Sequence, residues 1–108
     1  MTPTAHLDTF ARDNLPPETL LPELVFDLPE LRYPERLNCV VELLDKTVEA
    51  GNGERIAIRW SCGTWTYRQL LDRVDRIAHV LVGDLKLQSG NRILLRGAND
   101  PMMAACWW

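Results

Sequence analysis

Five side chains carrying a thiol or an imidazole are the first candidates for metal binding or nucleophilic catalysis. They are His6, Cys39, Cys62, His79 and Cys106, and none stands at the short spacings of zinc modules. Cys62, in a predicted turn, is the one thiol expected to be exposed, but no sequence pattern pairs it with His79 as nucleophile and base. The cysteines otherwise resemble small core residues. The sequence therefore predicts no metal ligand and no catalytic pair.

Three glycine-containing turns could hold a phosphate group, because backbone amides and a lysine can converge on phosphate oxygens there. Residues 51–54 (GNGE) and 83–90 lack the Lys-Ser/Thr pair of a nucleotide-binding loop. Residues 97–101 (GANDP) stand between a predicted strand and a predicted helix, but they offer one glycine, a proline without an amide and an aspartate. We expect ordinary turns and no cofactor-binding residue.

Nucleic-acid binding is suggested by a set of arginines and tryptophans in the second half of the chain. They are Trp60, Trp65, Arg68, Arg73, Arg76, Arg92 and Arg96. Asp72 and Asp75 interleave with the helical arginines, and a pI near 5.3 provides no general basic field. We expect the arginines to form a solvated helix face, and the tryptophans to lie in a core or on a sheet face.

Charge and proline content divide the 108 residues into two segments. Residues 1–54 carry eleven acidic and four basic side chains, whereas residues 55–108 carry four acidic and eight basic ones. Six of the seven prolines lie within the first 34 residues, and all six glycines follow residue 50. This shift predicts an extended Pro-rich leader, residues 1–37, that packs on an α/β segment, residues 38–108.

The composition, 46% hydrophobic and 25% charged, is typical of a soluble globular chain. No apolar run approaches the roughly 20 residues that span a bilayer, and the first eight residues lack the features of a signal peptide. Three cysteines without close spacing favour a reducing compartment. We expect a cytoplasmic protein without a membrane or nucleic-acid partner, and the sequence does not indicate its oligomeric state.

The leader carries too much apolar surface to be a plain linker. Its large apolar side chains are Leu20, Leu21, Leu24, Val25, Phe26, Leu28, Leu31 and Tyr33. Five prolines between residues 16 and 34 restrict helix to short turns, since each removes an amide donor. We expect the apolar side chains to pin the leader against a larger body.

Regular elements are predicted from Asn38 onward. Asn38 can N-cap a helix that ends at Gly51, where glycine can adopt the left-handed conformation. Residues 55–60 alternate at period two, which predicts a half-buried strand, and residues 64–66 form a short returning strand.

A second helix and a third strand follow. Residues 66–69 (TYRQ) fit a capping box, and the helix that they open is predicted to end at Gly83. Residues 92–96 are predicted to be a strand, and Asp100 and Pro101 to open a final helix. This order indicates one βαβ unit with a parallel strand pair. The final helix stops after about two turns without a typical C-terminal residue, so we expect an incomplete α/β domain.

Three motifs in this order resemble the AMP-forming adenylate-forming ligases, the superfamily of the acyl-CoA synthetases. Residues 64–70 (TWTYRQL) resemble the W-T-Y-x-E/Q-L opening of an early helix, and residues 87–95 (LQSGNRILL) resemble the strand motif L-x-x-G-D/N-R-V. Asn99 and residues 102–107 match the helix that follows. The resemblance implies the N-terminal part of the large ligase domain.

The leader resembles one subgroup of these ligases. Residues 11–17 (ARDNLPP) and 26–34 (FDLPELRYP) are similar to the leader of benzoate and 2-aminobenzoate CoA ligases. The resemblance implies that MgATP activates an aromatic acid to an acyl-adenylate with release of pyrophosphate, and that coenzyme A then accepts the acyl group. The family's phosphate loop, its acidic residue for ribose and Mg²⁺ and its mobile lysine have no counterpart here. It therefore implies no catalytic, cofactor-binding or metal-binding residue, and a fragment that is inactive and binds no cofactor alone.

Two other classes of function remain open from the residues. A stand-alone α/β module could bind a protein through its tryptophans and acidic leader. A nucleic-acid binder would associate with DNA or RNA in a salt-dependent manner.

Overall fold

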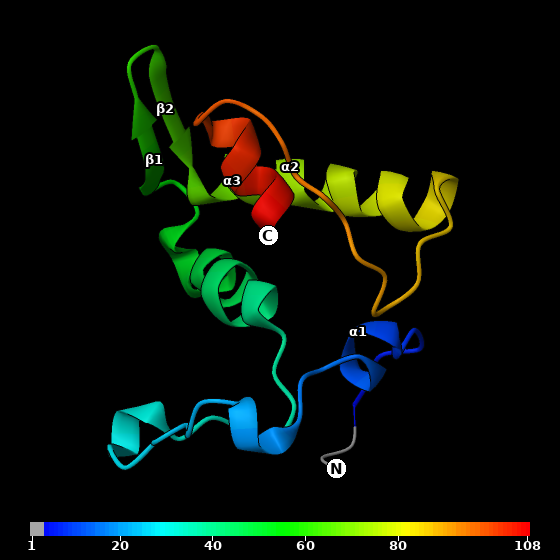
Figure 1. The fold of residues 1–108 in the computed structure, drawn as a ribbon. Coiled ribbons are helices and arrows are strands. Elements are labelled where there is room, and N and C mark those ends of the chain that lie inside the picture. The colour runs from blue at the N-terminus through cyan, green and yellow to red at the C-terminus, as the bar shows by residue number, and fades with distance from the viewer. Residues whose placement is uncertain (1–3) are drawn as a thin grey trace. The chain divides into compact units, whose positions relative to one another are not determined.

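The computed structural model describes residues 4–108, which the contacts within the chain divide into two units (Figure 1). The leader unit contains the residues up to Leu37 together with Gln88–Arg92. The core unit contains Asn38–Leu87 and Ile93–Trp108. The first three residues of the predicted leader lie outside the described residues. The loop Gln88–Arg92, which the sequence assigns to the second segment, thus groups with the leader.

The leader contains only short helical turns, as its prolines predict. These are α1 (Phe10–Asp13) and the 3₁₀ turns Glu18–Leu20 and Pro29–Leu31. Most of its large apolar side chains are exposed, although Phe26 and Tyr33 make an edge-to-face contact with ring centroids 6.0 Å apart. The packing of these side chains against a larger body stays a prediction.

The helix predicted after Asn38 is present, with two wide, π-type segments, Val41–Asp45 and Val48–Asn52. The Asn38 side-chain oxygen accepts hydrogen bonds from the amides two and three residues later, at 3.0 and 3.3 Å. Gly51 has a φ of +83°, the left-handed conformation expected at the end of this helix. Both predicted ends are confirmed.

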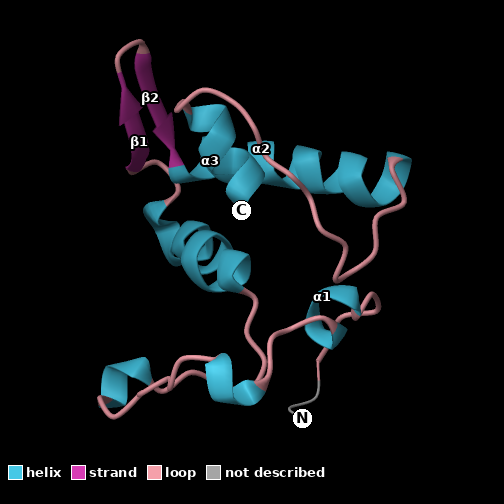
Figure 2. Cartoon of the chain, viewed as in Figure 1, coloured by secondary structure: helices cyan, strands magenta, loops and turns pink. Residues whose placement is uncertain are grey.

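The strands β1 (Ile56–Trp60) and β2 (Gly63–Thr66) form an antiparallel hairpin (Figure 2). Ile58 is paired with Trp65, and the register shifts between Ile56 and Ile58, which indicates a bulge. This hairpin is the only sheet in the described part of the chain, residues 4–108. The two strands predicted before residue 67 are confirmed.

Helix α2 (Tyr67–His79) begins at the predicted capping box and continues through a π-type turn, Val80–Asp84. The Thr66 hydroxyl accepts a hydrogen bond from the Gln69 amide (3.2 Å), and the Gln69 side chain accepts one from the Thr66 amide (2.9 Å). The predicted end at Gly83 is wrong. The wide last turn extends the helix, and Lys86 adopts the left-handed conformation, with a φ of +56°.

The strand predicted at residues 92–96 is not formed, so the parallel pair of the βαβ unit is absent from residues 4–108. The alternation of side chains persists, because Ile93 and Leu95 line an apolar cavity while Leu94 is 92% exposed. Alternation determines which way side chains face, but a strand also requires a neighbouring backbone with which to form hydrogen bonds. Here β1 is paired with β2 only.

Helix α3 (Pro101–Trp107) completes the core unit and begins as predicted. The Asp100 side chain accepts a hydrogen bond from the Met103 amide (3.0 Å), and Pro101 occupies the first turn. The core is small, with four buried apolar side chains from three helical elements: Leu44, Leu70, Val74 and Ala105. Helices and an antiparallel hairpin around this core confirm the predicted class, a partial α/β domain. Within residues 4–108, no helix is both long and apolar enough to cross a membrane.

Candidate functional site

The turn at residues 97–101 has the position of a phosphate loop, but the Asp100 side chain of this turn occupies the start of α3. The Asp100 carboxylate accepts the Met103 amide, which is one of the donors that a phosphate would use. Its negative charge would also repel a phosphate group. A Cβ added at Gly97 would lie 2.9 Å from the Met103 Cε atom, so this glycine accommodates a side chain of the same chain. The structure thus has the ordinary turn that we predicted.

The turn at residues 51–54 is closed by helix α2. The Gly53 carbonyl accepts a hydrogen bond from the Arg68 amide (2.9 Å), and Glu54 forms an ion pair with the Arg68 guanidinium (2.8 Å). A Cβ at Gly53 would lie 2.8 Å from an Arg68 nitrogen. Glycine is therefore needed here for the close approach of Arg68, and its carbonyl and neighbouring carboxylate are already engaged.

The sulfur and imidazole side chains do not assemble into a site. All three cysteines are free; Cys39 and Cys62 are exposed and Cys106 is half-buried. The prediction that the cysteines are core residues is wrong, and Cys62 is not the one exposed thiol, because the small core leaves most helix and turn positions at the surface. His79 is exposed on α2, as predicted. Among residues 4–108, no three His, Cys, Asp or Glu side chains gather as they would around a metal ion.

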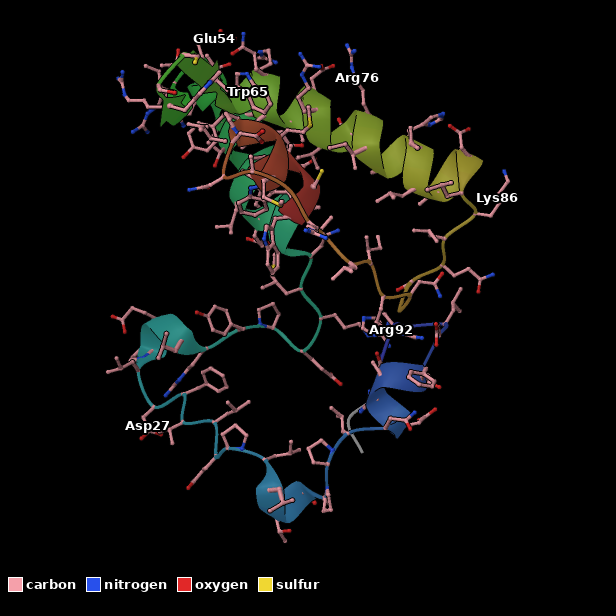
Figure 3. All side chains as sticks on the ribbon, turned by 45° about the horizontal axis from the view of Figure 1, so that its top comes forward. Asp27, Glu54, Trp65, Arg76, Lys86 and Arg92 are labelled. Atoms are coloured by element: carbon pink, nitrogen blue, oxygen red, sulfur yellow. The ribbon has the colours of Figure 1, made fainter. Side chains whose placement is uncertain are left out.

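The arginines and tryptophans form two ordinary structural groups. Arg68 pairs with Glu54, and Arg76 with Asp72 (3.1 Å), with all four side chains largely exposed. Figure 3 shows Arg76 projecting away from α2. Trp60 and Trp65 pack edge to face on the hairpin, with centroids 5.7 Å apart, and the Arg73 guanidinium lies 5.7 Å from the Trp65 ring centroid. The predicted solvated helix face is confirmed for Arg68, Arg73 and Arg76, and the sheet-face tryptophans are confirmed. The prediction is wrong for Arg92 and Arg96, which lie in an extended segment outside any helix.

One concave surface of the core unit is an apolar cavity of about 430 Å³. Helix α2, the extended residues 93–95 and α3 line it, through side chains that include Ile77, Leu81, Ile93, Leu95 and Trp107. Trp107, which is 78% exposed, also lines a second opening of about 460 Å³ with Cys39 and Trp108. These surfaces contain no carboxylate or imidazole that could transfer a proton. Both are lined mainly by apolar side chains.

One polar cluster was missed by the sequence analysis. Asp8 lies within hydrogen-bond distance of Asn91 and Arg92, which are 83 and 84 residues away in the sequence. Motif reasoning finds residues at short, fixed spacings, so it cannot find a pair of this separation. The sequence analysis considered Arg92 only as a nucleic-acid candidate and within the resemblance of residues 87–95, and it did not connect either residue with Asp8.

The chain matches the model of the AMP-binding enzyme family over residues 44–107, more than half of its length. This range contains the buried core, the hairpin, the capping box and α3. The chain therefore belongs to the AMP-binding enzyme family, whose members include acyl-CoA synthetases.

Curated relatives with significant similarity include two kinds of CoA ligase. An acetyl-coenzyme A synthetase of Mycolicibacterium smegmatis is 36% identical over 66 residues, covering 56% of this chain and 7% of the relative. That of Mycobacterium tuberculosis is 38% identical over 65 residues, covering 55% and 10%. A benzoate–CoA ligase of Thauera aromatica is 33% identical over 67 residues, covering 62% and 13%. The chain thus spans only about a tenth of these relatives, and no solved structure matches it significantly.

Proposed function

We propose that the chain is the N-terminal part of an ATP-dependent, cytoplasmic aryl-CoA ligase. The reaction joins an aromatic carboxylic acid to ATP, forming an acyl-adenylate and pyrophosphate. The thiol of coenzyme A then attacks the acyl carbon, and AMP leaves. The observation that carries the ligase assignment is the family match over residues 44–107.

The aromatic specificity is supported by two observations. The leader segments 11–17 and 26–34 resemble those of benzoate and 2-aminobenzoate CoA ligases, and they lie outside the residues that match the family model. A benzoate–CoA ligase is also among the relatives, over a slightly larger share of this chain than the acetyl-coenzyme A synthetases. Acetate is the competing substrate, because these synthetases are 36% and 38% identical over the shared segment, against 33% for the benzoate–CoA ligase.

The described residues do not fit ATP, Mg²⁺ or coenzyme A. The turn at residues 97–101 contains its own carboxylate, and the turn at 51–54 is closed by Arg68. The cavity beside α3 is apolar and lacks the charged groups that a triphosphate needs. No step of the ligase reaction is therefore assigned to these residues. Their role in the proposed enzyme is to form part of the scaffold of the AMP-binding domain.

The first experiment measures activity directly. The purified 108-residue chain, given ATP, Mg²⁺, coenzyme A and benzoate or 2-aminobenzoate, is expected to release no pyrophosphate. Turnover above a no-enzyme control would contradict the scaffold role. Sequencing the DNA beyond codon 108 is expected to show a frame, open or interrupted, that encodes a Gly-rich loop with a Ser/Thr-Lys pair. Its absence would contradict the ligase assignment.

A chimera tests the aromatic specificity. Residues 1–108 replace the corresponding residues of the Thauera aromatica benzoate–CoA ligase, and in parallel those of the Mycobacterium tuberculosis acetyl-coenzyme A synthetase. We expect benzoate-dependent activity in the first chimera and a larger loss of acetate-dependent activity in the second. The reverse order would contradict an aryl-CoA ligase and favour an acetyl-type enzyme.

The alternative is a stand-alone α/β interaction module. The observation that favours it is the exposed apolar surface around Trp107. A module would fold and bind a protein partner without any ligase sequence following it. The DNA sequence beyond codon 108 therefore distinguishes the two hypotheses.

A further inference from the structure

The segment Leu7–Phe10 of the leader makes a dense set of polar contacts with the turn Ser89–Arg92, all within the leader unit. The Leu7 and Asp8 amides both donate to the Ser89 carbonyl, at 2.9 and 3.0 Å. This pairing anchors the backbone of the leader on the turn at a single acceptor. The turn itself is closed by the Asn91 side chain, which accepts the Gln88 amide (2.8 Å).

The Asp8 carboxylate is the centre of the contact. One oxygen accepts hydrogen bonds from the Asn91 side-chain amide and the Arg92 guanidinium, both at 2.8 Å. The other accepts the Phe10 amide at 3.0 Å. The Phe10 amide, then the Asn91 amide and the Arg92 charge, hold the pKa of the Asp8 carboxyl below its ordinary value of 3.8, against an opposing effect of burial.

Two further features make the fit specific to this segment. The Arg92 guanidinium lies over the Phe10 ring, 4.4 Å from its centroid, within range for a cation–π contact (Figure 3 shows Arg92 beside α1). Gly90 has a φ of +99°, and a Cβ there would lie 2.1 Å from the Asp8 carbonyl oxygen. Any other residue at position 90 would therefore collide with the bound leader.

We propose that the turn Ser89–Arg92 is a recognition site for a short acidic segment with an aspartate two residues before an aromatic ring, and that Leu7–Phe10 occupies it to fasten the leader. The Ser89 carbonyl accepts hydrogen bonds from two backbone amides of the segment, and the Asn91 and Arg92 side chains donate to one oxygen of its carboxylate. The Arg92 guanidinium also lies over the aromatic ring, and Gly90 leaves room for the backbone of the segment. The contact joins residues more than 80 positions apart, whereas most apolar side chains of the leader are exposed. We call the contacts between Leu7–Phe10 and Ser89–Arg92 the polar clasp. The clasp is independent of the proposed ligase function.

Amide hydrogen exchange in the full chain tests the clasp. Asp8→Asn and Arg92→Ala are each expected to speed exchange of the Leu7 and Asp8 amides by about tenfold or more, since each removes a charged hydrogen bond. The matched controls are Asp13→Asn, which removes a carboxylate bonded locally to Thr9, and Arg96→Ala, an exposed arginine outside the clasp. Exchange within about twofold of the parent is expected for both. Equal effects of test and control variants would overturn the proposal.

Gly90→Ala tests the close approach of the backbone. It is expected to abolish protection of Leu7 and Asp8, whereas Gly51→Ala, also at a positive φ but with open space around it, is expected to leave that protection intact. Tryptophan fluorescence of both variants monitors the core unit, so that a clasp defect is distinguished from unfolding. Retained protection in a folded Gly90→Ala chain would overturn the proposal.

A peptide tests recognition in the absence of the covalent link. A peptide of residues 4–15 is added to the isotope-labelled Asp8→Asn chain, whose own segment is released. We expect amide shifts at Ser89, Gly90, Asn91 and Arg92, and much smaller shifts with a peptide that itself carries Asp8→Asn. No shifts, or equal shifts with the two peptides, would show that the turn does not recognise the aspartate.

Discussion

Each of the two units is stabilised internally by a different kind of interaction. The core unit buries Leu44, Leu70, Val74 and Ala105, which come from three separate helical elements. The leader unit leaves most of its apolar side chains exposed and is held by the polar clasp between Asp8 and the turn Ser89–Arg92. Hydrophobic burial thus stabilises the core unit, whereas charged hydrogen bonds stabilise the leader unit.

This difference determines how each unit responds to perturbation. A core of four buried side chains is small, so the loss of one removes a large fraction of its stability. The clasp depends on ionisation and on a few donors, and it responds to pH and to changes of a single charge. The predictions below separate the two responses.

The largest effect is expected from Leu44→Ala. Leu44 is 1% exposed, and truncating a buried leucine costs about 2–5 kcal/mol. A small domain has a free energy of unfolding of about 5 kcal/mol, so the core unit would be close to unfolding. Urea denaturation followed by circular dichroism measures the change.

Leu94→Ala is the matched control for this deletion. The same atoms are removed from a side chain that is 92% exposed, so a change within about 0.5 kcal/mol is expected. If both variants were equally destabilised, the exposed segment 93–95 would be part of the core and the comparison between the units would be wrong.

Elements specified by neighbouring residues were predicted well. Asn38, the Thr66–Gln69 capping box and Asp100 each form the predicted caps, because a cap involves only residues two or three positions apart. The hairpin follows from alternation and a short turn in the same way.

Features that depend on distant residues could not be predicted. The strand at residues 92–96 requires a neighbouring strand, and its alternation alone did not reveal that none pairs with it. The helix does not end at Gly83, because the wide turn Val80–Asp84 includes this residue. The left-handed conformation occurs at Lys86 instead. The contact of Asp8 with Arg92 spans 84 positions, for which a single sequence contains no signal.

Thr66→Ala is expected to lower the free energy of unfolding of the core unit by an intermediate amount, without affecting the clasp. The Thr66 hydroxyl caps α2, and the loss of such a cap costs about 0.5–2 kcal/mol. Urea denaturation should show a lower midpoint, while the Leu7 and Asp8 amides exchange as in the parent chain at low urea. Thr64→Ala, at an exposed position of β2, is the control. A cap variant as stable as this control would show that packing alone determines where α2 begins.

Acidification is expected to open the clasp before it affects the core. The pKa of Asp8 is lowered in the folded chain, so the clasp is fully formed above the ordinary value of 3.8 and is lost as the pH falls through the lowered value. An NMR titration of the Asp8 side chain and of the Leu7 amide, from about pH 6 to pH 2, follows this change. The Asp8→Asn chain should show no transition at Leu7 over this range. A transition that persists there would assign the pH dependence to another group.

Lys86→Gly is expected to have the smallest effect on the free energy of unfolding, and it should raise this energy instead of lowering it. A side chain in the left-handed conformation costs about 1–2 kcal/mol, whereas glycine loses more backbone entropy on folding, so the net stabilisation is about 0.5 kcal/mol. Urea denaturation measures it, and Lys46→Gly, inside a helix, is expected to destabilise by about 1 kcal/mol. Lys86 precedes the clasp turn by only three positions. If its replacement also slowed exchange at Leu7 and Asp8, the end of α2 would set the conformation of the turn, and the two units would be coupled through this junction.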